Sequence, residues 1–183
     1  MTDTRILLPL ALAATYLATF GLALTTTQTD RLILAAALAA PLIWLSITDL
    51  GRHEIPDLAT ATIALAGAVF QWHLNGLTTV FLLTILSATA LTALFWGAGS
   101  LYFRRKGIEA LGIGDAKLIG AATLCLGPAG VWAMLFLAAS GGILALLLSR
   151  RREKAARGIA FGPFLAYALF ILVNFPLSGP SLP

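Results

Sequence analysis

The chain has 183 residues, of which 59% are hydrophobic and only 11% are charged, and its formal net charge is +4. Soluble domains carry about 25% charged residues. This composition, with a mean hydropathy of +0.92, therefore excludes a soluble globular protein and indicates a polytopic membrane protein. Basic residues beside membrane spans set topology, so the positive charge requires no nucleic-acid partner.

Long apolar runs predict an all-α bundle of six or seven membrane-spanning helices. Most runs approach the ~20 residues that a helix needs to cross a bilayer. The fifth run is short and carries charge, which leaves the number open between six and seven. The first run is longer than the ~7–15 apolar residues of a signal peptide, so we interpret it as a transmembrane helix. The candidate spans are 5–26, 31–48, 58–75, 77–102, 113–126, 130–149 and 158–176.

The chain contains no internal repeat and no long hydrophilic insertion. We therefore expect residues 1–183 to form a single integral membrane domain in contact with the lipid bilayer, without a soluble domain. The segment after Asn174 is rich in proline, glycine and serine, and we expect a frayed external tail there.

Basic residues in the connections between candidate spans cluster in alternate connections, and only Arg31, beside Asp30, lies in an opposite one. Arg52 lies in the first of these connections, residues 104–106 lie in the second, and five basic residues between 150 and 157 lie in the third. The positive-inside rule assigns these connections to the cytoplasm. With seven spans, the N-terminus is then predicted inside and the C-terminus outside.

A charged stretch, "DLGRHEIPD", connects the second and third spans at residues 49–57. His53 and Glu54 begin like the HExxH zinc motif, but Asp57 stands where the second histidine belongs and Pro56 would disrupt the required helix. We therefore predict neither a metal nor a cofactor, and interpret His53 and Glu54 as solvated loop groups. The single cysteine, Cys125, lies in an apolar run and is expected to be a small core residue.

A second unusual stretch, "LGIGDAKLIGAA" at residues 111–122, places Asp115 at the start of the fifth span, on the same membrane side as Asp49. An ionisable residue in a span costs about 2.5–3.5 kcal/mol, so it suggests a functional site. The alternative is that Asp115 caps its helix at the membrane interface. Gly112 and Gly114 favour the functional interpretation, because glycine lets another main chain approach the acid closely.

Two carboxylates held together in a low-dielectric site share one proton, which is the state that aspartic proteases use. The ionised member accepts a proton from the attacking water and the protonated member polarises the scissile carbonyl. A membrane transporter with a proton or cation relay is an alternative, but no inverted repeat is visible. With only two histidines and no nucleophile elbow, a serine hydrolase is disfavoured.

Three segments, "ITDLGRHEIPD", "LGIGDAKL" and "IAFGPFLAYA", resemble the signature blocks of type IV prepilin peptidases, which are GxGD membrane aspartic proteases. The resemblance covers about residues 45–170 in the same order. It implies that Asp49 and Asp115 form the catalytic dyad. It also implies that the substrates are prepilins or pseudopilins, whose short basic leader is removed at the cytoplasmic face of the prokaryotic inner membrane.

Larger members of that family carry an N-terminal methyltransferase region with paired CxxC motifs. Because Cys125 is the single cysteine, the resemblance implies a short, peptidase-only form, and we expect no binding of S-adenosylmethionine. A GxGD protease that cuts other membrane peptides is the alternative within the same chemistry.

The remaining site residues are predicted to support the dyad. Pro56 and Asp57 begin the third helix, where Asp57 has a structural or substrate-orienting role. Lys117 either reaches the membrane interface or meets another acid, and it tunes the dyad without taking part in catalysis. Gly162 and Pro163 either bend the last helix against the catalytic helices or provide a small packing surface.

Overall fold

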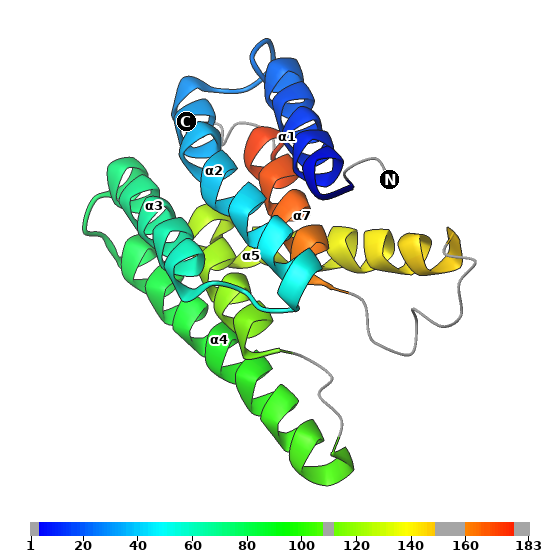
Figure 1. Cartoon of the computed structure of the whole chain (residues 1–183). Coiled ribbons are helices and arrows are strands. Elements are labelled where there is room, and N and C mark those ends of the chain that lie inside the picture. The colour runs from blue at the N-terminus through cyan, green and yellow to red at the C-terminus, as the bar shows by residue number, and fades with distance from the viewer. Residues whose placement is uncertain (1–3, 108–111, 149–159, 178–183) are drawn as a thin grey trace.

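The computed structural model describes residues 4–107, 112–148 and 160–177, and within these residues every element is a helix (Figure 1). The prediction of an all-α helix bundle is therefore confirmed. The six helices of the described residues are α1 (Thr4–Ala23), α2 (Thr29–Arg52), α3 (Asp57–Asn75), α4 (Thr79–Lys106), α5 (Ile113–Leu148) and α7 (Gly162–Asn174).

Three of these helices, α2, α4 and α5, are long and apolar enough to cross a membrane by length and composition. Shorter apolar stretches are present in α1, at Pro9–Ala23, and in α7, at Gly162–Asn174. Many side chains that face away from the bundle are apolar as well: Leu17 and Leu22 of α1, for example, are each 70% exposed. Such surfaces suit a hydrocarbon environment.

Helix α5 joins the predicted fifth and sixth spans in one element of 36 residues. Gly127 interrupts the helical backbone with φ 76° and ψ 169°, and Pro128 follows it. Glycine tolerates this positive φ without the steric cost of a side chain, and proline often marks a helix kink. Figure 1 shows the second half of α5, in yellow, running sideways from the bundle. The predicted break between residues 126 and 130 is therefore a kink.

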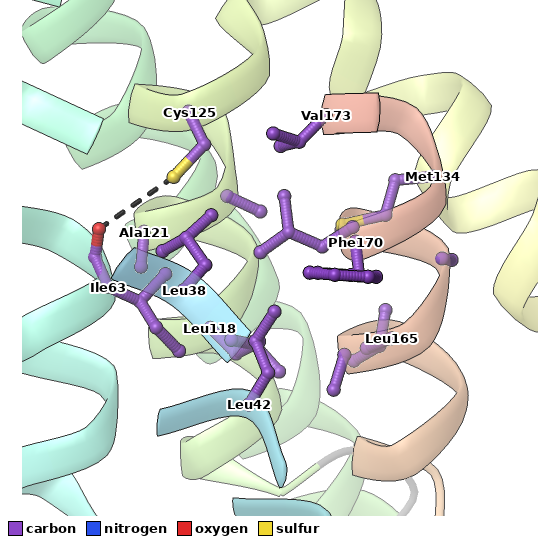
Figure 2. Packing of buried hydrophobic residues seen from close by; sticks show 14 of the residues in the cluster. Leu38, Leu42, Ile63, Leu118, Ala121, Cys125, Met134, Leu165, Phe170 and Val173 are labelled. Atoms are coloured by element: carbon purple, nitrogen blue, oxygen red, sulfur yellow. Dashed lines mark hydrogen bonds between the residues drawn. The ribbon is translucent and has the colours of Figure 1, made fainter. Parts of the chain in front are cut away.

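Helix α5 is the central element, since it packs against α3, α4 and α7, while α7 also packs against α2. Figure 2 shows Leu38, Leu42, Leu118 and Phe170 among the side chains of the buried apolar cluster that joins these helices. Cys125 belongs to this cluster, as predicted, and its Sγ lies 3.7 Å from the carbonyl oxygen of Ile63.

Helix α7 begins at Gly162, with Pro163 in its first turn. Proline suits the start of a helix because its fixed φ is helical and its missing N–H would have no intrahelical partner there. The interpretation that Gly162 and Pro163 bend the last helix is therefore wrong: they start it. The first residues of the predicted span, 158 and 159, lie outside the described residues.

The end of α2, the start of α3, the end of α4 and the start of α5 lie at the same end of the bundle (Figure 1). This end carries Arg52 in the last turn of α2 and three basic residues, Arg104, Arg105 and Lys106, in the last turn of α4. The five basic residues between positions 150 and 157, which were predicted to face the cytoplasm, lie outside the described residues. The described part of the chain thus gathers two of the three basic connections at one end.

Candidate active site

A cleft of about 1020 Å³ lies at this end of the bundle, between the last turns of α2, the connection to α3 and the first turns of α5. It contains seven of the nine residues predicted for the site: Asp49, Pro56, Asp57, Gly112, Gly114, Asp115 and Lys117. Gly162 lies beside the cleft and contacts Asp49. Pro163 follows it in the first turn of α7.

Asp49 lies in the last turn of α2 and is only 6% exposed. Its Oδ2 atom accepts a hydrogen bond from the backbone N–H of Gly162 at 3.0 Å. Its carbonyl oxygen accepts the N–H of His53 at 2.9 Å, where a left-handed backbone with φ 54° ends the helix. The carboxylate is therefore oriented by the start of α7, far away in sequence.

Asp115 lies in the first turn of α5 and is partly buried. The helix begins two residues earlier, at Ile113, so Asp115 is a first-turn acid and not the residue that precedes the helix. A carboxylate in a first turn is favoured by the helix dipole. A Cβ atom added to Gly112 would lie 3.4 Å from Asp115 Oδ2, so the backbone of Gly112 lies alongside this carboxylate.

Lys117 donates a hydrogen bond from Nζ to Oδ1 of Asp57 at 2.6 Å, and the two side chains form an ion pair. Of the two positions predicted for Lys117, the structure shows contact with another acid. The pair joins the start of α3, where Pro56 is the residue before the helix, to the second turn of α5. The side chain of Lys117 is 43% exposed and that of Asp57 is 77% exposed, so water reaches both.

Ile55 is a site residue that the sequence analysis missed. A Cβ atom added to Gly114 would lie 2.7 Å from Ile55 Cβ, and one added to Gly162 would lie 3.3 Å from Ile55 Cδ1. The signal available in the sequence was its position: it is an isolated apolar residue among charged ones, directly before Pro56. His53 and Glu54 are exposed, as predicted for loop groups, but they also line the cleft.

The groups in the cleft that can take part in acid–base chemistry include the carboxyl groups of Asp49 and Asp115. Asp49 and Asp115 come from two different helices and face one cleft. Within the described residues, no group of three or more His, Cys, Asp or Glu side chains is arranged to hold a metal ion.

Comparison with known proteins places these residues in a family. Residues 36–148 match the Type IV leader peptidase family. The leader peptidase HopD of Escherichia coli is 33% identical over 150 residues, which cover 77% of this chain and 90% of that protein. No solved structure matches the chain.

Longer relatives are also similar. The prepilin leader peptidase/N-methyltransferase of Pectobacterium carotovorum subsp. carotovorum is 31% identical over 134 residues, covering 72% of this chain and 47% of that protein. That of Burkholderia pseudomallei strain K96243 is 30% identical over 158 residues, covering 85% and 48% respectively. The chain thus spans about half the length of these two relatives. The family match and the three long apolar helices identify an integral membrane protein, and the chain belongs to the type IV leader peptidase family.

Proposed function

We propose that the chain is a membrane aspartic endopeptidase that removes the short basic leader of type IV prepilins or pseudopilins. The observation that carries this proposal is that Asp49 and Asp115 line the same cleft, although they belong to different helices. The printed names of the relatives, which include prepilin leader peptidases and a leader peptidase, support the substrate class.

The reaction needs no group beyond the two carboxyls, water and the peptide. One carboxylate accepts a proton as water attacks the scissile carbonyl, while the protonated partner donates a hydrogen bond to the carbonyl oxygen. Collapse of the tetrahedral species transfers a proton to the leaving amine. The hydrogen bond from Gly162 to Asp49 supports this role, because it fixes one carboxylate oxygen before substrate binds.

The cleft is proposed to open to the cytoplasm. Two observations support this orientation: Arg52 lines the cleft, and the last turn of α4, with its three basic residues, lies at the same end of the bundle (Figure 1). Basic residues are retained on the cytoplasmic side of membrane spans. The membrane is then the prokaryotic cytoplasmic membrane, where the basic leader of a substrate would approach acidic residues of the cleft.

The test is co-expression with a prepilin, followed by mass spectrometry of the prepilin N-terminus. Cleavage directly before the apolar helix, absent with the Asp115→Asn variant at equal membrane levels, supports the proposal. If the chain cleaves other membrane peptides but no prepilin, the proposed substrate class is wrong and a protease for other membrane peptides is favoured. If no cleavage occurs but the chain carries protons or cations across liposome membranes, the alternative of a membrane transporter with an ion relay is favoured.

A further inference from the structure

The side chain of Ile55 lies between the start of α5, which carries Asp115, and the start of α7, which contacts Asp49. A Cβ atom added to Gly114, in the first turn of α5, would lie 2.7 Å from Ile55 Cβ, 3.2 Å from Cγ1 and 3.4 Å from Cδ1. A Cβ atom added to Gly162, at the start of α7, would lie 3.3 Å from Cδ1. Ile55 therefore occupies space that a side chain at either glycine would need, and its Cδ1 atom reaches both.

Each of these two glycines is coupled to one aspartate. Gly114 directly precedes Asp115 in the chain. Gly162 donates its N–H to Asp49, and a Cβ atom on Gly162 would lie 2.7 Å from Asp49 Oδ2 and 3.0 Å from Cγ. The side chain of Ile55 thus touches the backbone that carries one carboxyl group and the backbone that orients the other.

Ile55 is itself held firmly. It lies in the short connection that starts where His53 ends α2 and stops where Pro56 precedes α3. A residue before proline is restricted to extended backbone, and a β-branched side chain has few χ1 rotamers. Ile55 is partly buried and packs against the apolar core of the bundle. Its side chain can therefore act as a rigid spacer.

We infer that Ile55 is a positioning residue that sets the separation of the Asp49 and Asp115 carboxyl groups, an inference that rests on the proposed aspartic peptidase activity. A water molecule and a scissile carbonyl must fit between the two carboxyls, so a change in their separation lowers the rate of the chemical step. We expect Ile55 to affect kcat, because its side chain contacts the backbone next to Asp115 and the backbone that orients Asp49.

The kinetic test compares Ile55→Val, Ile55→Ala and wild type in cleavage of a prepilin by purified enzyme in liposomes. Valine removes only Cδ1, the atom near both glycines, and alanine removes all atoms beyond Cβ. We expect kcat to fall about fivefold for Ile55→Val and about 50-fold for Ile55→Ala, with KM within about twofold of wild type, since misplacement of about 1 Å can cost 10²-fold.

Ile43 provides the matched control. It lies on α2, is partly buried and packs against the same core, but it does not line the cleft. Ile43→Ala is expected to keep kcat within about twofold of wild type if the effect at Ile55 comes from positioning. An equal loss of kcat in Ile43→Ala, an unchanged kcat in Ile55→Ala, or a raised KM with unchanged kcat overturns the inference.

A second measurement needs no substrate. It therefore tests the positioning role of Ile55 separately from the proposed peptidase activity. In a Cys125→Ala background, Asp49→Cys and Asp115→Cys are linked with bifunctional thiol reagents of increasing spacer length. We expect one preferred reagent length with Ile55 present and a shifted or broadened preference with Ile55→Ala. An identical length preference with and without Ile55→Ala would show that Ile55 does not set the separation, whether or not the chain cleaves prepilins.

Discussion

The backbone N–H of Gly162 donates a hydrogen bond to Oδ2 of Asp49, joining residues that are 113 positions apart in the chain. The start of α7 therefore orients a carboxylate that belongs to the end of α2. Glycine is required at this position by space: an added Cβ atom would lie 2.7 Å from Asp49 Oδ2 and 3.0 Å from Cγ. A side chain at position 162 would therefore force the Asp49 carboxylate or the start of α7 to move.

The Gly162→Ala variant is expected to displace the Asp49 carboxylate while the Asp49 side chain itself is kept. Since a shift of about 1 Å in a catalytic group can cost 10²-fold, we expect kcat for leader cleavage to fall by roughly 10- to 100-fold. The control is Gly97→Ala on α4, where an added Cβ meets nothing within 4 Å. Wild-type kcat in Gly162→Ala would contradict the orienting role of Gly162.

The two glycines that precede Asp115 are expected to differ in their tolerance of alanine. A Cβ atom on Gly114 would lie 2.7 Å from Ile55 Cβ, whereas one on Gly112 would lie 3.4 Å from Asp115 Oδ2, an ordinary contact. Because Ile55 Cβ cannot rotate away, Gly114→Ala should lower the cleavage rate at least about tenfold and Gly112→Ala less than about threefold. Rates measured in liposomes check this order, and the reverse order would refute it.

The ion pair of Lys117 and Asp57 is expected to contribute little to stability despite its 2.6 Å distance. Side chains that are 43% and 77% exposed interact through water, and such pairs contribute about 0.2–1 kcal/mol. A double-mutant cycle of Lys117→Met and Asp57→Asn, followed by thermal unfolding in detergent, measures the coupling. It should weaken with added salt. A salt-independent coupling above about 2 kcal/mol would indicate a desolvated pair.

Cys125 is expected to have no part in the reaction. Its side chain is 2% exposed, and a Cβ atom on Gly67 of α3 would lie 2.8 Å from its Sγ atom, so the thiol is enclosed between helices. We expect N-ethylmaleimide neither to label Cys125 in the folded protein nor to inhibit cleavage, because reagents need an accessible thiolate. Mass spectrometry before and after unfolding checks the labelling. Inhibition that requires Cys125 would point to thiol chemistry.

The sequence predicted the helices well where apolar runs were long and bounded by charge. The second and third runs, 31–48 and 58–75, correspond to Thr29–Arg52 and Asp57–Asn75. The prediction differed from the structure at glycine and proline pairs, because such a pair can kink a helix or start one, and the apolar pattern is similar in both cases. Gly127 and Pro128 kink α5, whereas Gly162 and Pro163 start α7.

The charged residues of the candidate site could be predicted from the sequence, but the position of Ile55 in that site could not. Asp49, Asp115, Asp57 and Lys117 were conspicuous because ionisable residues are rare and costly near a membrane. The contact of Ile55 with residues 114 and 162 depends on how three distant segments pack, and no periodicity in the sequence encodes it. The partner of Lys117 was likewise open, since a lysine side chain reaches several positions at a membrane surface.

The most direct test of the account is whether Asp49 and Asp115 act as one unit. Cleavage of a prepilin by purified enzyme in liposomes is measured for Asp49→Asn, Asp115→Asn and the double variant. Catalytic groups that act together are strongly non-additive. If the two aspartates form one dyad, each single variant loses all measurable cleavage beyond background while remaining folded, and the double variant is no worse than either. Substantial cleavage by either single variant, or losses that add in the double variant, would contradict a shared catalytic dyad.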